Sequence, residues 1–244
     1  MTVLPATPAE TMPAVAVHHL RFRWRPDQPW ILDIADFTLR SGERLFLAGP
    51  SGSGKSTLLA LIAGIHHPTE GQIAVFGADL TALSSVARDR LRADQMGVIF
   101  QMFNLLPYLS VLENVTLPCR FSAARRARAC MAAGSVRADA HRLLTHLGLD
   151  DPKLEQRAAA ELSVGQQQRV AAARALIGRP ALIIADEPTS ALDAERRRDF
   201  VELLRAECAS VGAALLFVSH DRSLAGQFDR MLELPDLNAA SLAG

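Results

Sequence analysis

The sequence predicts an α/β fold in which a helical segment is inserted into a sheet-forming core. An apolar run typical of a strand, LFLA at 45–48, leads through a glycine-rich stretch into an apolar helix pattern. Two more unbroken apolar runs, within ALIIADE (181–187) and ALLFVSH (214–220), are typical of strands covered on both faces. Between Leu105 and Leu162 no strand pattern occurs, and leucines recur at helical spacing.

The composition is that of a globular protein with no overall charge. The chain has 244 residues, 49% hydrophobic, and its 26 Lys and Arg balance its 26 Asp and Glu. A net charge of zero gives no global electrostatic reason to bind nucleic acid, so no nucleic-acid partner is expected. The longest apolar runs, such as AALLFV (213–218), are far shorter than the roughly 20 residues that a membrane-spanning helix needs.

The first residues and the cysteines indicate a cytosolic protein. Residues 1–16 contain three prolines and lack a basic start, so we expect a disordered tail rather than a signal peptide. Cys119, Cys130 and Cys208 are odd in number and lack the spacing of metal ligands. We expect them to be reduced thiols.

The N-terminal part of the core is expected to form antiparallel strands. Residues 15–24 alternate between apolar and polar side chains, which is typical of a half-buried strand. The segments DFTLR (36–40) and ERLFLA (43–48) flank a Ser-Gly pair at 41–42, and this arrangement predicts two strands joined by a turn.

From residue 49 onward helices and strands alternate, as in α/β proteins. The expected order is a helix to about residue 64, a strand at 72–77, a charged helix at 86–93, a strand at 97–100, a strand at 181–187, a helix at 196–209 and a strand at 214–220. The expected domain spans 17–235, with core parts at 17–100 and 166–235, a helical subdomain at 101–165 and a C-terminal tail at 236–244.

The stretch GPSGSGKS (49–56) matches the phosphate-loop pattern G-x-x-x-x-G-K-[ST] in its required place, between a strand and a helix. Glycines let the backbone wrap a phosphate, and successive N–H groups then point inward at a helix N-terminus. Lys55 reaches the β- and γ-phosphates, and the Ser56 hydroxyl can ligate Mg²⁺. The predicted nucleotide-binding residues here are Gly49, Pro50, Ser51, Gly52, Ser53, Gly54, Lys55, Ser56 and Thr57.

Two adjacent carboxylates end the apolar strand at 181–187. Consecutive strand residues point in opposite directions, so Asp186 can face the metal while Glu187 accepts a proton from the attacking water as general base. Strand ends often carry acidic residues at the solvent boundary, so this pair alone is weak evidence for a metal site. Together with the phosphate loop it becomes strong evidence.

Together with these motifs, the stretch LSVGQQQRV (162–170), followed by AAARAL and then by the 181–187 strand, resembles the ATP-binding subunits of ABC transporters over nearly the whole chain. The resemblance implies a P-loop NTPase with a RecA-like core sheet, an antiparallel β subdomain and an inserted α-helical subdomain. It implies ATP and Mg²⁺ as ligands and ATP hydrolysis as the activity.

The resemblance also implies roles for residues outside the phosphate loop. Gln101 senses the metal and the attacking water, His220 lies near the γ-phosphate, and Trp24 takes the place of the aromatic residue that stacks on adenine. Taken alone, each of the three is an ordinary boundary or core residue. By the same resemblance, residues 162–170 are the family signature and residues 190–193 are the loop that crosses between subunits. These two segments add Ser163, Gly165, Gln166 and Asp193 to the nucleotide contacts.

A signature that leads into the Asp186 strand cannot readily fold over its own phosphate loop. As the family implies, it faces the loop of a second ATPase subunit, so two ATP molecules are enclosed in a head-to-tail homodimer. The implied partners are integral membrane permease subunits, which hold the protein at the cytoplasmic face of the inner membrane.

One position departs from the family pattern, because Val164 stands where the commoner signature has its first glycine. Valine disfavours a positive φ and adds bulk beside a phosphate. If the backbone there is extended or helical and the side chain turns away, we expect function to survive.

The sequences of residues 97–118, of DEPTSALD (186–193) and of the signature are similar to those of the lipoprotein-release and macrolide-export branch of the family. Import ATPases share much of it, and a transporter-like pair that transmits force to cell-envelope proteins is a further alternative. A soluble ABC ATPase acting on translation or DNA is disfavoured, because neither a duplicated phosphate loop nor sustained heptads occur.

Two surface features have more than one interpretation. The apolar stretch MFNLLPYLS (102–110) can form the groove for a cytoplasmic helix of the permease, or simply pack within the helical subdomain. Five arginines between 120 and 137 can contact anionic headgroups or a partner, but a solvated helix face is the favoured interpretation.

Overall fold

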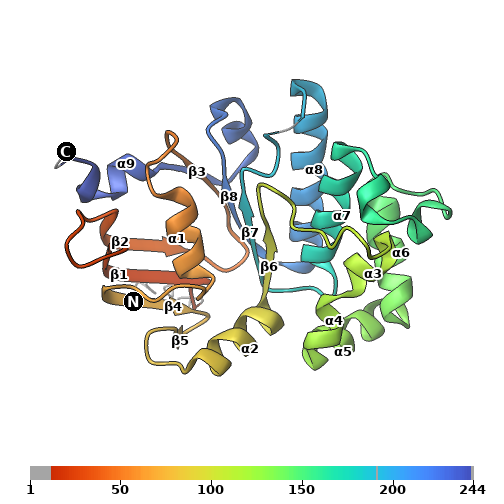
Figure 1. Cartoon of the computed structure of the whole chain (residues 1–244), viewed down its shortest axis with the longest axis horizontal. Helices are drawn as coiled ribbons and strands as arrows, with labels where there is room; N and C mark the ends of the chain where they lie inside the picture. Colours follow the sequence, from red (N-terminus) through yellow and green to blue (C-terminus); the bar gives the residue numbers. More distant parts are fainter. Residues whose placement is uncertain (1–11, 191, 243–244) are drawn as a thin grey trace, which may run out of the picture.

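A computed structural model describes residues 12–190 and 192–242 of the chain. The tail expected at 1–16 lies outside the described residues up to residue 11, and the first strand begins at Val15, two residues before the expected domain start. Within the described part, the named strands form two sheets with helices between and around them (Figure 1).

The smaller sheet is antiparallel and has the strand order β2-β1-β4-β5. Its strands are β1 (Val15–Phe22), β2 (Leu32–Leu39), β4 (Glu70–Val75) and β5 (Ala78–Asp79). The alternation predicted from the sequence is present, since β1 and β2 share one pattern of buried and exposed residues. One face of this sheet is therefore apolar and packs inward.

The larger sheet is parallel and has the strand order β6-β7-β8-β3-β9. Its strands are β3 (Arg44–Ala48), β6 (Met96–Ile99), β7 (Leu182–Asp186), β8 (Ala214–Val218) and β9 (Arg230–Glu233). All five residues of β8 and the first four of β7 are buried. The unbroken apolar runs therefore do mark strands covered on both faces.

The predicted antiparallel pairing of 36–40 with 43–48 is wrong. After the turn the chain leaves the antiparallel sheet. Strand β3 lies between β8 and β9 in the other sheet and is parallel to both. The physical reason is visible in its composition, because four of the five residues of RLFLA are buried and no polar residue alternates with them. A strand without a polar face is stable only where both faces are covered.

The helices are α1 (Lys55–Ile62), α2 (Ser85–Gln95), α3 (Val111–Thr116), α4 (Pro118–Phe121), α5 (Ala123–Ala133), α6 (Val136–His146), α7 (Val164–Leu176), α8 (Ala194–Val211) and α9 (Leu234–Leu237). Helices α3 to α6 lie between β6 and β7 in the chain, where the sequence predicts the helical insertion. None of the described helices has the length and apolar character needed to span a bilayer.

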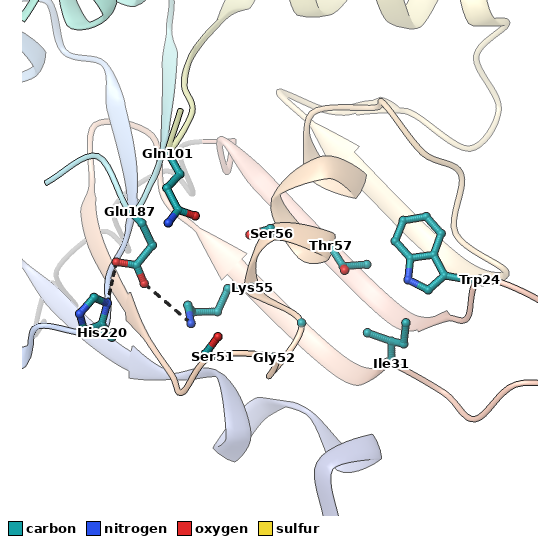
Figure 2. Close-up of a pocket in the computed structure, with 11 residues that line it drawn as sticks. Trp24, Ile31, Ser51, Gly52, Lys55, Ser56, Thr57, Gln101, Glu187 and His220 are labelled. Atoms are coloured by element: carbon teal, nitrogen blue, oxygen red, sulfur yellow. Dashed lines mark hydrogen bonds and ion pairs between the residues drawn. The ribbon is translucent and has the colours of Figure 1, made fainter. Parts of the chain in front are cut away.

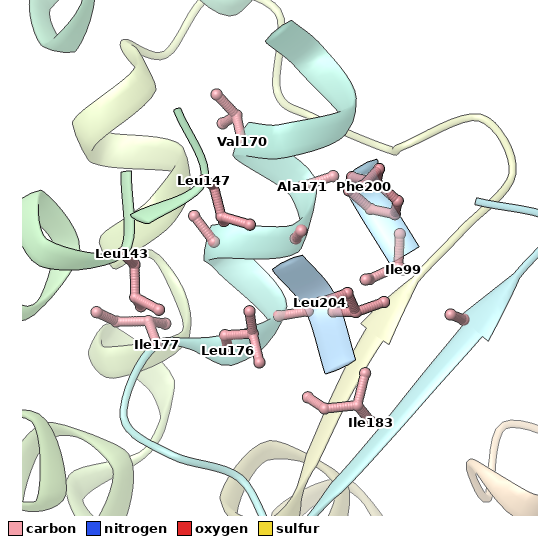
Figure 3. Packing of buried hydrophobic residues seen from close by; sticks show 14 of the residues in the cluster. Ile99, Leu143, Leu147, Val170, Ala171, Leu176, Ile177, Ile183, Phe200 and Leu204 are labelled. Carbon is pink, nitrogen blue, oxygen red and sulfur yellow. The ribbon is translucent and has the colours of Figure 1, made fainter. Parts of the chain in front are cut away.

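The parallel sheet separates two hydrophobic cores. Leu45 and Leu47 of β3 point into the core shared with α1 and the antiparallel sheet. Phe46 and Ala48 point into the opposite core, which contains α7, α8 and the helical subdomain. In this second core Ala171 of α7 lies toward Phe200 of α8, and Leu204 of α8 lies near Ile99 of β6 and Ile183 of β7 (Figure 3). The sheet thus fixes α1 on one side and α7 on the other.

The described part of the C-terminal tail expected at 236–244 is helical and contacts the rest of the domain. It continues as α9 and a short 3-10 helix at Ala239–Leu242. The Asn238 side chain accepts a hydrogen bond from the Asp33 N–H at 2.7 Å and donates one to the Ile31 carbonyl at 2.8 Å. The C-terminal residues are therefore attached to the start of β2.

The arginine-rich stretch is solvated only in part, because Arg120, Arg126 and Arg137 are exposed while Arg125 and Arg128 are not. Arg125 is buried and donates to the carbonyls of Met96, Ala175 and Ile177. Arg128 donates to the Gly178 and Asp94 carbonyls, Arg126 to that of Cys119, and Arg137 pairs with Glu155. Burial lowers the pKa of Arg125 to about 10, which leaves it charged at neutral pH. These contacts join α5 to the end of α7 and the start of β6.

Replacing Arg125 with alanine is expected to lower the free energy of unfolding by about 3 kcal/mol, because buried carbonyls lose a charged donor. Chemical denaturation measures this change. The matched control is Arg120→Ala in the same stretch, an exposed position where the change should stay below about 0.5 kcal/mol. Equal effects of the two substitutions would contradict the structural role of Arg125.

Candidate functional site

The phosphate loop lies between β3 and α1, as the sequence predicts. Gly52 and Gly54 have φ values of +81° and +97°, which only glycine adopts without strain. A Cβ at Gly54 would come within 2.9 Å of Leu32 Cδ2. These glycines therefore set both the loop conformation and its close approach to the antiparallel sheet.

Lys55 is the first residue of α1 and is buried. Its ammonium donates to the carbonyl oxygens of Gly49 and Pro50, at 2.8 Å each. The same nitrogen lies 3.9 Å from Glu187 Oε1. The lysine charge is thus held at the loop, in front of the carboxylate that follows β7 (Figure 2).

Glu187 joins Lys55 to His220. Its Oε2 lies 2.9 Å from His220 Nδ1, at the end of the neighbouring strand β8. Glu187 has a φ of +46°, and its N–H donates to the Val218 carbonyl. A left-handed residue ends the alternation of the strand, so the expected opposite directions of Asp186 and Glu187 do not follow from strand geometry. Both carboxylates approach the phosphate loop.

Asp186 contacts Ser56 and is largely shielded from water. Burial raises its pKa, the nearby Glu187 raises it further, and a hydrogen bond from Ser56 and the charge of Lys55 act in the opposite direction. Its Oδ1 is buried without a hydrogen-bond partner among the described residues. An orphaned carboxylate oxygen beside a hydroxyl is the type of donor set that a hard divalent cation takes.

A cavity of about 680 Å³ connects these groups to Trp24. It is lined by Trp24, Ile31, Ser51, Gly52, Gly54, Lys55, Ser56, Thr57, Gln101, Glu187 and His220. Figure 2 shows Trp24 and Ile31 at one end and Glu187, His220 and Gln101 at the other. Four further predicted residues do not line the cavity. Three belong to the phosphate loop, namely Gly49, Pro50 and Ser53, and the fourth is Asp186 at the end of β7.

The Trp24 ring is about half exposed and packs against two other rings. Its centroid lies 4.9 Å from the Phe22 ring and 5.1 Å from the His66 ring, both in edge-to-face geometry. Ile31 adds an aliphatic contact to this end of the cavity. Sequence patterns gave no signal for Ile31 or His66, because both reach Trp24 only through the tertiary fold.

Gln101 is followed by two non-glycine residues with positive φ, Phe103 at +58° and Asn104 at +50°. Arg174 of α7 donates to the carbonyls of both, at 2.5 and 2.6 Å. Such left-handed residues persist only when their surroundings hold them. The loop behind Gln101 is therefore fastened to α7.

The remaining predicted residues meet at a second hollow, of about 490 Å³. Ser163, Gly165, Gln166 and Asp193 line it, together with Gly148, Leu149, Val164, Gln168, Arg169, Leu192, Arg196 and Phe200. No lining residue is common to the two hollows. One chain therefore does not bring its signature residues to its own phosphate loop.

Ser163 begins α7 as part of a capping box. Its Oγ accepts from the Gln166 N–H, and Gln166 Oε1 accepts from the Ser163 N–H. The Ser163 hydroxyl hydrogen remains available to a further acceptor. Val164 is the first helical residue, so it avoids a positive φ, but its side chain is 48% exposed and borders the hollow.

We expect Asp186→Asn to stabilise the protein when nucleotide and divalent cations are absent. Because burial raises the pKa in the folded state, the ionised group opposes folding at neutral pH, and this opposition is lost as the pH falls through the raised pKa. The gain should therefore be largest at neutral pH and shrink on acidification, as urea unfolding at two pH values would show. Asp199→Asn, at an exposed position, is the control. A neutral-pH loss of stability in the Asp186 variant would disprove the expectation.

Comparisons with known proteins agree with this geometry. A family model described as ABC transporter matches residues 32–190. The chain is 40% identical to the lipoprotein-releasing system ATP-binding protein LolD of Shewanella sp. (strain MR-4), over 84% of each chain. It is also 40% identical to the uncharacterized ABC transporter ATP-binding protein YbbA of Escherichia coli (strain K12), over 93% of this chain and 96% of that protein.

Solved structures give the same result. The dimeric structure of MJ0796, a bacterial ABC transporter cassette, superposes with a TM-score of 0.78 at 32% identity, covering 90% of this chain and 93% of that one. A dimeric post-hydrolysis state of the same cassette, bound to ADP and Pi, gives a TM-score of 0.77. With its P-loop fold and its paired carboxylates at the phosphate loop, the chain belongs to the ABC transporter family, as an ATP-binding subunit with ATPase activity.

Proposed function

We propose that the chain hydrolyses MgATP in a head-to-tail homodimer that drives a membrane permease of the lipoprotein-releasing type. The observation that carries the dimer is the separation of the two hollows, since each holds half of the residues that the family uses on one nucleotide. Two copies related by a twofold axis bring each first hollow to the partner's second one. The dimeric state of the MJ0796 cassettes supports this arrangement.

In this proposal ATP lies along the first cavity. The loop amides and Lys55 bind its phosphates, with α1 directing its N-terminus at them. The base lies at the Trp24 end, where a half-exposed aromatic ring and Ile31 offer a stacking surface. The apolar Ile31 and the Trp24 ring lie at one end of the cavity, and the charged Lys55 and Glu187 lie at the other, which suits the base and the phosphates of a nucleotide (Figure 2).

Ser56, Asp186 and Gln101 would hold Mg²⁺. The fit rests on the orphaned Asp186 oxygen beside the Ser56 hydroxyl, a set of oxygen donors. Mg²⁺ is usually bound by one or two protein groups together with substrate phosphates. When bound, it would neutralise charge on the phosphate oxygens.

The side chains around the γ-phosphate position then act by placement and charge. Glu187 accepts a proton from the attacking water, and its bond to His220 fixes the carboxylate in one orientation. Lys55 neutralises charge that develops on the transferred group. His220 holds the transition state, and its ring is oriented by the same contact. The partner's Ser163 hydroxyl and α7 N-terminus supply further donors, since the capping box leaves that hydroxyl hydrogen available.

The permease is proposed to contact the helical subdomain. Met102 and Tyr108 are 81% and 76% exposed, while Phe103 of the same stretch is buried in the core. The packing interpretation of residues 102–110 therefore holds for Phe103, and the groove is proposed for the exposed side chains. Such exposed apolar residues suit a partner surface. This contact would place the protein at the cytoplasmic face of the inner membrane.

The similarity to LolD supports lipoprotein release, and force transmission to envelope proteins is the alternative that the uncharacterized YbbA leaves open.

Glu187→Gln tests the composite site. It keeps the shape of the side chain but removes the base, so ATP hydrolysis is expected to fall by about 10²- to 10⁴-fold. An ATP-bridged dimer should then accumulate, which size-exclusion chromatography with light scattering detects. The control is Glu202→Gln on the exposed face of α8. A Glu187 variant that binds MgATP yet stays monomeric at every ATP concentration would disprove the composite site.

Val164→Gly tests whether the departure from the signature pattern matters. Because Val164 is already helical at the first position of α7, we expect the glycine variant to hydrolyse ATP at nearly the rate of the original chain. Steady-state ATPase measurements decide this, with Val86→Gly, an exposed valine near the start of α2, as control. A large gain in rate would mean that the valine side chain impairs contact with the partner's phosphates.

A further inference from the structure

We propose that Arg197 is a positioning residue that couples the partner-facing hollow to His220 within one chain. The inference rests on the proposed function, because it assumes that the second hollow receives a partner's nucleotide. Nothing in the sequence pattern marks Arg197, which is one of three consecutive arginines in α8. Its contacts in the fold distinguish it from the other two.

Arg197 lies in the first turn of α8 and bridges two loops that are distant in sequence. Its Nη2 donates to the Leu192 carbonyl at 2.8 Å, and its Nη1 pairs with Asp221 Oδ2. The side chains of Arg197 and Asp221 are each only 23% exposed. A partly shielded, charge-assisted bond of this kind is stronger than a surface ion pair.

At the Leu192 end, the bridge lies beside the signature residues of the second hollow. Leu192 lines the second hollow beside Val164 and Asp193. One of its methyl groups lies 3.7 Å from the point that a Cβ on Gly165 would occupy. In this proposal, a partner's nucleotide that displaces the start of α7 acts through this proximity on Leu192 and on the carbonyl that Arg197 holds.

The Asp221 end fixes the backbone next to His220. Asp221 Oδ1 accepts hydrogen bonds from the N–H and hydroxyl of Ser223, at 3.1 and 2.6 Å, while Oδ2 receives Arg197. The Ser223 and Arg197 contacts lower the pKa of Asp221, so it is ionised at neutral pH. Both carboxylate oxygens are thus engaged, and the preceding residue, His220, contacts Glu187.

These contacts form one continuous series from the signature to the general base. It passes from Gly165 through Leu192, Arg197 and Asp221 to His220. A guanidinium suits the central place because its separate nitrogens donate in fixed directions to two acceptors at once. Arg196 takes no part, since it pairs with Asp193, and Arg198 is exposed. The bridge lets engagement of the partner's nucleotide at one hollow adjust the catalytic groups at the other.

The test compares Arg197→Ala, Arg197→Lys, Asp221→Asn and the double variant Arg197→Ala/Asp221→Asn with Arg198→Ala as matched control. The full-length chain is used, and steady-state hydrolysis over a range of MgATP concentrations gives kcat, KM and the Hill coefficient. Equilibrium binding of MgATP and thermal unfolding are measured on the same samples. Asp221→Asn approaches the bridge from its other end, should Arg197→Ala fail to fold.

We expect Arg197→Ala to lower kcat by about 10- to 100-fold, the effect of misplacing a catalytic group, with little change in KM or in MgATP binding. The Hill coefficient should fall toward one. The double variant should lose no more than the single ones, because both remove the same contact. Arg197→Lys should recover part of the rate, since an ammonium can still pair with Asp221.

A kcat and Hill coefficient for Arg197→Ala equal to those of Arg198→Ala would overturn the proposal. So would independent, multiplying losses in the double variant, or a loss of rate that only matches a loss of folded protein. Failure of the unaltered chain to bind or hydrolyse MgATP is a different result, because it would refute the proposed function itself.

Discussion

The site depends on a single constraint, which is that β3, β6, β7 and β8 pair in parallel and are covered on both sides of their sheet. Parallel strands end at one edge of the sheet, and the chain leaves each of them through a loop. The phosphate loop, Gln101 and His220 follow β3, β6 and β8, and the Asp186–Glu187 pair lies at the end of β7. Apolar packing on the two sides of the sheet therefore brings the catalytic groups together at one edge.

Those parts of the site that the sequence predicts are local or lie at strand ends. The phosphate loop follows from residue types at fixed offsets, and the carboxylate pair follows from an apolar run that stops at Asp186. The doubly covered strands β7 and β8 and the helical insertion are likewise visible in the spacing of apolar residues. The separation of the signature from the phosphate loop was expected from chain order, and the two hollows have it.

The rest depends on long-range packing that no local pattern records. The turn at 41–42 suggested a hairpin, yet β3 joins strands more than 160 residues away, because burial on both faces overrides the turn. Charge spacing suggested a solvated arginine face, but Arg125 satisfies carbonyls at the ends of other elements. The bridge made by Arg197 is invisible for the same reason, since its acceptors are a backbone carbonyl and a residue on another loop.

The attachment of Asn238 to the start of β2 has a practical meaning for anyone who produces this protein. Asn238 holds the backbone of Ile31 and Asp33, and Ile31 forms the wall beside Trp24 on which a base would rest. Trimming the chain after β9, or fusing a bulky tag close to Asn238, would loosen that wall from behind. A nucleotide affinity measured on such a shortened or tagged protein would be lowered by the altered terminus as well as set by the phosphate loop.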